Sequence, residues 1–139
     1  MSADAQRQFF DTTVAVYAAS DSDFKGSVAR ELLAVVGSVI SVQVLDEFVA
    51  VARGKLKWPW DKVQEALTDI RALCDPVLPL TVETHEAALE IAARYGYHIY
   101  DALILASAIE AGCDVLYSED MQDGQQIDGL TIRNPFARR

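Results

Sequence analysis

The stretch "IYDALILASAIEAG", Ile99–Gly112, constrains the fold more than any other part of the sequence, because on a helix it is apolar around almost its whole circumference. It nevertheless carries an acid, Asp101, in its first turn. At about 100° per residue, Ile104 and Ala108 lie within about 60° of Asp101, whereas Glu110 lies about 180° away. The sequence therefore predicts a buried helix that turns one carboxylate toward the interior of the protein.

Short apolar runs alternate with helical patterns along the chain, and this alternation predicts the fold class. Glycines at 37, 54, 96 and 112 follow helical patterns and are expected to end helices. We expect strands at residues 7–10, 39–42, 76–80, 113–118 and 130–134, the last at an edge of the sheet, and helices at 23–36, 43–53, 62–73, 83–95 and 99–112. Such alternation is typical of an α/β protein with a mostly parallel sheet covered on both faces. In these sheets the functional crevice lies beyond the carboxyl ends of the strands.

Length and charge narrow the class of protein further. The 139 residues predict a single domain over residues 1–139 with a hydrophobic core. The N-terminus is polar and no apolar run approaches the roughly 18 residues of a membrane span, so we expect a cytoplasmic protein without membrane contact. The formal net charge of −9 argues against binding of nucleic acid through a general basic surface. A metal-dependent enzyme is compatible with this charge, because bound divalent cations reverse the local sign.

Four acids are placed where the crevice rule expects functional residues. Asp11 ends the first expected strand and Asp120 directly follows the strand "DVLYS". Glu47 lies one turn into the helix after "VISV", and Asp101 opens the apolar helix. Each acid also has a purely structural explanation. Asp11 could belong to a turn, and Asp120 could cap the segment "SEDMQDG". Glu47 could be a solvated helix residue, and Asp101 could be a favourable charge at a helix N-terminus. The sequence predicts that all four lie at one rim of the sheet.

The inward position of Asp101 decides between these explanations. A carboxylate at a helix N-terminus is stabilised by about 0.3–1 kcal/mol. Burial of an unpaired carboxylate costs several kcal/mol, so the helix dipole alone does not explain an inward acid. A cluster of carboxylate oxygens suits hard cations such as Mg²⁺ or Mn²⁺. These ions activate water and stabilise the charge of an attack on phosphorus, which is phosphodiesterase chemistry.

Four segments resemble PIN-domain proteins of the VapC-type toxin group: "FFDTTVAVYAAS", "SVQVLDEF", "YHIYDALILASAIEAGCDVLYSEDMQDGQ" and "LTIRNPF". The resemblance covers nearly the whole chain. It implies a three-layer α/β/α PIN-like sandwich with a mostly parallel central sheet, and a Mg²⁺- or Mn²⁺-dependent endoribonuclease that hydrolyses RNA phosphodiesters by metal-activated water. It also implies a toxin that forms a homodimer and is neutralised by an antitoxin protein encoded beside it.

The resemblance implies a role for individual residues. The acids of the family's site correspond to Asp11, Glu47, Asp101 and Asp120, which would be both the metal ligands and the catalytic residues. The small hydroxyl residue after the first acid corresponds to Thr12.

Two positions depart from the family's pattern. The family often has Asn two residues after the first acid, and Thr13 stands there in this chain, so that a supporting contact would be made by a hydroxyl in place of an amide. After the fourth strand the chain reads "SEDMQDG", where many relatives have a different acidic pattern. A second acid of this loop, Glu119 or Asp123, is therefore a further candidate for metal binding.

The segment "RGKLKWPWDK", Arg53–Lys62, gathers four basic residues around Trp58 and Trp60 in an otherwise acidic chain. It could contact RNA or form part of a protein interface, where tryptophan and arginine are enriched. It could also be a helical connection whose tryptophans cover the core. The sequence leaves these three interpretations open.

Three functions fit the sequence to different degrees. The first is the metal-dependent endoribonuclease. The second is a catalytically silent PIN-fold binding module that acts through protein–protein contacts, and the presence of all four acids disfavours it. The third is a phosphoryl-transfer domain with Asp11 as nucleophile, which ranks last because Asp11 does not begin a DxD arrangement and no lysine is well placed near the acids.

Overall fold

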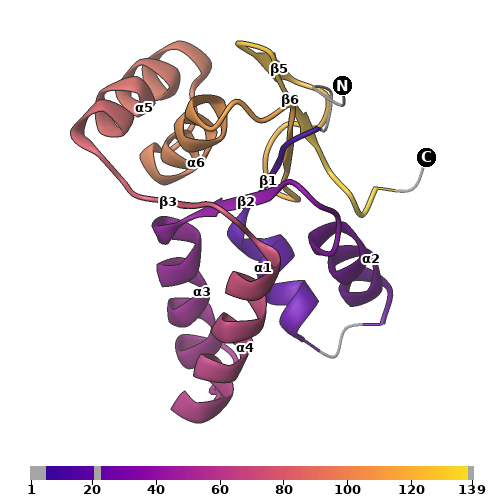
Figure 1. The fold of residues 1–139 in the computed structure, drawn as a ribbon. Coiled ribbons are helices and arrows are strands. Elements are labelled where there is room, and N and C mark those ends of the chain that lie inside the picture. Colours follow the sequence, from indigo (N-terminus) through magenta and orange to yellow (C-terminus); the bar gives the residue numbers. More distant parts are fainter. Residues whose placement is uncertain (1–5, 21–22, 138–139) are drawn as a thin grey trace.

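A six-stranded sheet forms the centre of the computed structural model, which describes residues 6–20 and 23–137 (Figure 1). Its order is β3-β2-β1-β4-β6-β5, and all neighbouring strands are parallel except β5 and β6. The strands are β1 (Gln8–Phe10), β2 (Ser38–Ser41), β3 (Val77–Leu78), β4 (Val115–Tyr117), β5 (Gln126–Ile127) and β6 (Leu130–Arg133). The prediction of a mostly parallel sheet is confirmed.

Helices cover both faces of this sheet. They are α1 (Thr12–Ala19), α2 (Phe24–Leu33), α3 (Val42–Gly54), α4 (Trp60–Leu73), α5 (Val82–Tyr95) and α6 (Ile99–Glu110). Helices α1 to α4 lie on one side of the sheet, and α5 packs against α6 on the other (Figure 1). The architecture is the α/β sandwich that the sequence predicts.

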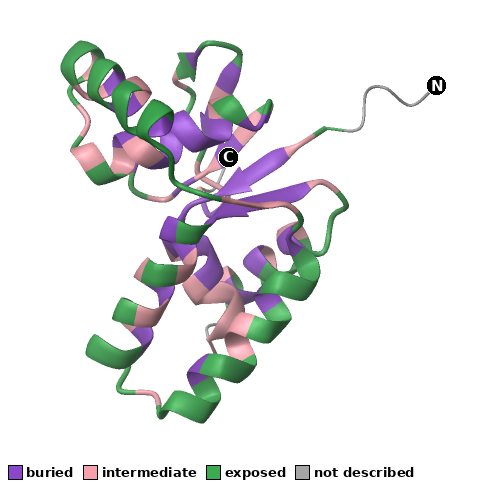
Figure 2. Ribbon diagram, turned by 60° about the vertical axis from the view of Figure 1, so that its left-hand side comes forward, coloured by how far each residue is buried: buried purple, intermediate pink, exposed green. Residues whose placement is uncertain are grey.

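The hydrophobic core lies where the central strands meet these helices. Every residue of β1 and β2 is buried, as expected of parallel strands with both faces covered (Figure 2). In α6 the residues from Ile104 to Ala108 are all buried, so this helix is enclosed by the sheet and α5, and Glu110 at its end is exposed. Within the described ranges, none of the helices has the length and apolar character needed to cross a membrane.

Two elements were not predicted. Helix α1 follows β1 immediately, although its sequence "TTVAVYAA" is rich in β-branched residues and has no clear helical period. Strand β5 is joined to β6 by Asp128 and Gly129, which both have positive φ, as a two-residue hairpin turn requires. Because β6 lies between β4 and β5, the expectation that the last strand forms an edge of the sheet was wrong.

The glycine assignments were correct at two of four helix ends. Gly96 directly follows α5 and Gly112 follows Ala111, the C-cap of α6, and both glycines have positive φ. Gly37 has φ +98° but lies beyond the end of α2, in the turn before β2, where a Cβ would come within 2.5 Å of a backbone oxygen. Gly54 is still helical, and the left-handed residue after α3 is Lys57 with φ +59°.

Candidate functional site

The four predicted acids come from four different elements. Asp11 follows β1 and Asp120 lies just beyond β4, and these neighbouring strands are parallel with Phe10 opposite Tyr117. Glu47 lies in the second turn of α3, and Asp101 lies in the first turn of α6. Their charges interact: Asp101 and Asp120 both raise the pKa of Asp11, and Asp120 and Glu47 both raise the pKa of Asp101. The fold thus brings the four carboxylates together at the carboxyl end of the sheet.

Asp11 is the most enclosed of the four, with 5% of its surface exposed. It caps α1, because its Oδ1 accepts a hydrogen bond from the backbone N–H of Thr12 at 2.7 Å. Its Oδ2 accepts one from the hydroxyl of Ser118 at 2.8 Å. Burial raises the pKa of Asp11 from 3.8 to about 6, although these two hydrogen bonds act in the opposite direction. Ser118 was not predicted, and its position directly after a strand was the available signal.

Glu47 is held through both carboxylate oxygens. The hydroxyl of Thr12 donates to Oε1 at 2.5 Å, which fits the supporting role expected of this residue. The side-chain amide of Gln43 donates to Oε2 at 3.2 Å and to the backbone oxygen of Tyr100 at 2.9 Å. Helices α1, α3 and α6 are therefore joined around Glu47. Gln43 was not predicted, although it lies four residues before Glu47 on the same face of α3.

Thr13 shows no comparable contact. Its Oγ1 is buried and has no hydrogen-bond partner among the described residues. The structure therefore gives Thr12, and not Thr13, a contact with the acids.

Asp101 of α6 and Asp120 of the loop after β4 complete the cluster. Asp101 is half-buried, and burial is the largest cause of its raised pKa, followed by the charges of Asp120 and Glu47. Asp120 is exposed, and its backbone N–H donates to the Ser118 hydroxyl at 3.3 Å. Ser118 thus contacts both Asp11 and the backbone of the loop that carries Asp120.

The two further acids of this loop make contacts with other elements. Glu119 forms an ion pair with Lys25 of α2 and accepts a hydrogen bond from the hydroxyl of Tyr17 at 3.0 Å. Asp123 Oδ1 accepts from the backbone N–H of Asn134 at 2.9 Å. These contacts connect the loop to α1, α2 and the segment after β6.

The donor set suits a hard divalent cation, because it consists of carboxylate oxygens. Two of the four acids have pKa values raised by burial and by neighbouring negative charge, which a bound cation would offset. In the described part of the chain, however, no group of three or more His, Cys, Asp or Glu side chains is arranged closely enough to hold an ion. The chemistry of these donors and their placement on one rim suit a hard divalent cation, although the described side chains are not drawn together closely enough to coordinate one in this arrangement.

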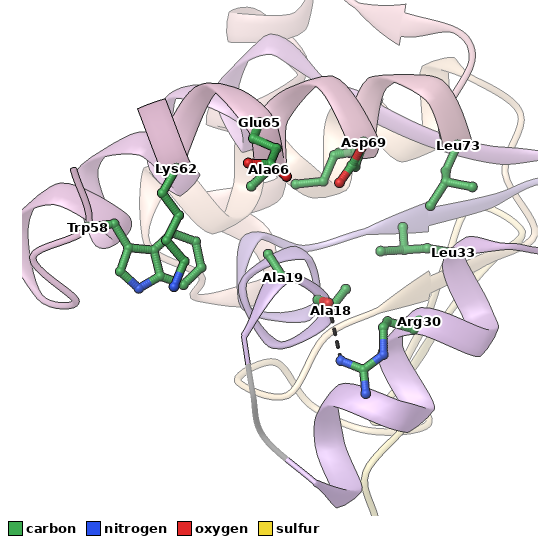
Figure 3. Close-up of a pocket in the computed structure, with 11 residues that line it drawn as sticks. Ala18, Ala19, Arg30, Leu33, Trp58, Lys62, Glu65, Ala66, Asp69 and Leu73 are labelled. Carbon is green, nitrogen blue, oxygen red and sulfur yellow. Dashed lines mark hydrogen bonds between the residues drawn. The ribbon is translucent and has the colours of Figure 1, made fainter. Parts of the chain in front are cut away.

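A separate groove with a volume of about 340 Å³ lies between α1, α2 and α4 (Figure 3). Its walls are largely apolar, with Arg30, Lys62, Glu65 and Asp69 among them. None of the four acids lines this groove.

Comparison with known proteins identifies the family. A family model described as the PIN domain matches residues 9–123. The chain belongs to the PIN domain family. Asp11, Glu47, Asp101 and Asp120 all fall within the matched part of this PIN domain. A comparison with curated proteins finds no match.

Solved structures with the same fold include toxins and their complexes. VapC20 of Mycobacterium tuberculosis, a toxin that cleaves the sarcin-ricin loop, is 22% identical with a TM-score of 0.67, over 81% of this chain and 89% of that one. A toxin–antitoxin complex from Klebsiella pneumoniae is 20% identical with a TM-score of 0.70, over 93% and 98% of the two chains. DNA-bound VapBC from Salmonella typhimurium is 20% identical with a TM-score of 0.69, over 94% and 98%.

Proposed function

We propose that this PIN domain is a Mg²⁺- or Mn²⁺-dependent endoribonuclease and the toxin of a toxin–antitoxin pair. The observation that carries the proposal is the convergence of four carboxylates from separate elements, two of which have raised pKa values. Burial of like charges lowers stability, and such arrangements are concentrated at functional sites. Similarity of fold to VapC20 and to VapBC complexes supports this interpretation.

Asp11, Glu47, Asp101 and Asp120 would hold the ion or ions. Bound Mg²⁺ or Mn²⁺ supplies a water with a lowered pKa and positive charge close to the scissile phosphate. The chain's own part is to fix the ligands. Thr12 and Gln43 orient both oxygens of Glu47. Hydrogen bonds to both oxygens of Asp11 leave this side chain in one orientation.

The same contacts argue against Asp11 as a phosphoryl-accepting nucleophile. Both of its oxygens accept hydrogen bonds and only 5% of its surface is exposed. Lys25, a possible partner for a phosphoryl group, is paired with Glu119 instead.

We propose an antitoxin protein as partner and a homodimer as the assembly, with the RNA substrate cleaved in the cytoplasm. Two of the structural neighbours, those from Klebsiella pneumoniae and Salmonella typhimurium, are toxin–antitoxin complexes, which supports a partner of this kind. The groove between α1, α2 and α4 is suited to apolar side chains of such a protein, since Leu73 in its wall is 47% exposed.

The deciding experiment is cleavage of a mixed-sequence single-stranded RNA that carries a fluorophore and a quencher, with Mn²⁺, Mg²⁺ or EDTA. Asp101→Asn removes one proposed ligand. Asp46→Asn is the matched control, because it removes the same charge from an exposed position beside Glu47. We expect cleavage by wild type and Asp46→Asn in Mn²⁺ or Mg²⁺, and none in EDTA or by Asp101→Asn.

Cleavage that persists in EDTA would refute the metal-dependent mechanism. If no RNA is cleaved, thermal shift with Mn²⁺ separates the two remaining cases. A shift that Asp101→Asn abolishes would indicate a nuclease with a narrow RNA specificity. No shift would favour the catalytically silent binding module.

A further inference from the structure

The turn between α3 and α4 carries a concentration of positive charge that the acid cluster does not use. Residues 53–60 read "RGKLKWPW" and contain three basic residues and no acid, in a chain of net charge −9. Arg53, Lys55 and Lys57 are all exposed. We call Arg53, Lys55, Lys57 and Trp60 the basic turn. Its charge favours a polyanionic ligand.

The two tryptophans of this segment have different environments. Trp58 is half-buried and packs edge-on against Phe48 of the core, with ring centroids 6.2 Å apart. Trp60 is 55% exposed. Trp58 therefore covers the core, as one interpretation of the sequence proposed, whereas Trp60 is largely open to solvent.

Arg53 and Trp60 form a prearranged pair. The Arg53 guanidinium lies over the Trp60 ring at 4.5 Å from its centroid. Arg53 Nη1 also donates a hydrogen bond to the backbone oxygen of Trp58 at 2.9 Å, which fixes the guanidinium in place. An exposed aromatic ring with an arginine over one face is a suitable platform for an unpaired base on its other face, because bases stack on aromatic rings and arginine contacts phosphate.

Lys57 adds an independent observation. Its φ of +59° places it in the left-handed region, which glycine adopts without strain and lysine does not. Glycine at this position would give a more stable turn. The chain instead has an exposed cation at the tip of the hairpin.

The basic turn lies on the same helix hairpin as one of the acids. Glu47 is in the second turn of α3 and Arg53 is in its last turn, six residues further on, so they are about 9 Å apart along the axis. The turn lies at the end of the hairpin that is farthest from the sheet (Figures 1 and 2). It does not form part of the groove proposed for the antitoxin, since Trp60 is absent from the groove wall.

We propose that the basic turn binds single-stranded RNA beside the cleavage point, with Trp60 stacked on a base and Arg53, Lys55 and Lys57 against phosphates. This inference rests on the proposed ribonuclease function and assigns a substrate-binding surface to it. RNA is favoured over a protein ligand because the turn combines three cations and an exposed indole with no acid.

The test measures binding without cleavage. Asp101→Asn protein in EDTA is titrated against a short fluorescein-labelled single-stranded RNA of mixed sequence, and anisotropy is recorded at several salt concentrations. Trp60→Ala is expected to weaken binding roughly 5- to 100-fold, the effect of one lost base stack. An RNA duplex of the same sequence should bind more weakly than the single strand, because its bases are not free to stack.

Lys57→Gly shows whether a loss of RNA binding is independent of any loss of stability, because the two properties should change in opposite directions. It should raise the melting temperature, because glycine relieves the left-handed strain. The plot of log association constant against log salt concentration should also become less steep by about 0.7, the effect of one lost phosphate contact. Arg71→Ala is the matched control, since it removes one exposed charge from the last turn of α4 and should leave RNA affinity within about twofold.

The outcomes distinguish this inference from the proposed function. If Trp60→Ala and Lys57→Gly bind RNA like their parent, or if the parent binds no RNA, the basic turn is not an RNA-binding surface. Unchanged RNA affinity combined with loss of antitoxin binding would assign the turn to a protein interface. Weakened RNA binding by both variants, with neither metal-dependent cleavage nor a Mn²⁺-induced thermal shift in wild type, would refute the nuclease and retain the surface.

Discussion

Asp11→Asn tests whether the acid cluster lowers the stability of the metal-free protein. Burial raises the pKa of Asp11 from 3.8 to about 6. At pH values between these two pKa values, the folded protein keeps a proton on Asp11 that the unfolded chain has released. The folded state therefore binds more protons, and this group's contribution to stability falls as the pH rises through that window.

The magnitude follows from the two pKa values. A difference between 3.8 and about 6 corresponds to about 3 kcal/mol of unfolding free energy, at about 1.36 kcal/mol per pKa unit. Asparagine avoids this cost because it carries no charge. Its amide would still accept from the Thr12 N–H but would present N–H groups to Ser118 Oγ, which already lies 3.3 Å from the backbone nitrogens of Asp120 and Met121. That mismatch costs about 1 kcal/mol, so the expected net gain is about 2 kcal/mol above about pH 7.

The assay is urea unfolding of wild type and Asp11→Asn in EDTA, at about pH 8 and about pH 4. At about pH 8 the variant should be more stable by about 2 kcal/mol, and its melting temperature should be roughly 6–10 °C higher. At about pH 4 the gain should vanish, and the variant should be less stable by up to about 1 kcal/mol. Added Mn²⁺ should stabilise wild type more than the variant, because the variant lacks one proposed ligand.

A difference in stability that is the same at both pH values would refute the reasoning, because a pH-independent effect cannot come from the ionisation of Asp11. Destabilisation at about pH 8 would mean that the hydrogen bonds from Thr12 and Ser118 outweigh burial.

Two further predictions concern the acid cluster, and a third concerns a buried contact away from it. Asp101→Asn should show a smaller Mn²⁺-induced rise in melting temperature than wild type, measured by thermal shift, and an equal rise would contradict metal binding by this acid. Thr12→Val removes the hydrogen bond to Glu47, so it should lower kcat for RNA cleavage by roughly 10- to 100-fold and lower the unfolding free energy by about 1–3 kcal/mol in a variant that still folds. Thr84→Val removes a buried hydroxyl that donates to Glu110 at 2.6 Å, so it should lower the unfolding free energy by about 1–3 kcal/mol and leave RNA cleavage unchanged. Loss of activity in the folded variant would contradict a purely structural role of Thr84.

The parts of the fold with strong sequence periodicity were predictable. The buried helix at 99–112 corresponds to α6, and the run "CDVLYS" contains β4. Helix α1 was missed because "TTVAVYAA" combines β-branched and small apolar residues, so its local pattern favours neither a strand nor a helix clearly. The capping contact from Asp11 and packing against α2 and α3 determine its conformation.

The sequence of the β5–β6 hairpin contains the turn dipeptide Asp128–Gly129, although the hairpin itself was not predicted. "DG" between two short runs is typical of a two-residue turn, and Asp128 and Gly129 do adopt positive φ. The runs themselves are too short for their alternation to be recognised, since β5 has two residues.

The location of the four candidate acids at the carboxyl end of the sheet could be predicted, but the residues that contact them could not. The ends of the strands place Asp11 and Asp120 at the same edge of the sheet, because the carboxyl ends of parallel strands share one edge. Ser118 and Gln43 are recognised only when the three-dimensional contacts are known, since each joins elements far apart in sequence. Serine after a strand and glutamine on a helix are common, and neither has a spacing that singles it out.

Helix α6 shows how the protein tolerates such a site. Its interior face contributes fully buried residues such as Leu105 and Ala108, and complete burial of one leucine stabilises a protein by about 1.5–3 kcal/mol. The same helix carries Asp101, whose pKa is raised first by burial and then by the negative charges of Asp120 and Glu47. Apolar packing therefore compensates for the unfavourable charge in the same turns of one helix. A cation bound by these acids would remove part of their repulsion, so metal binding and the stability of α6 should rise and fall together.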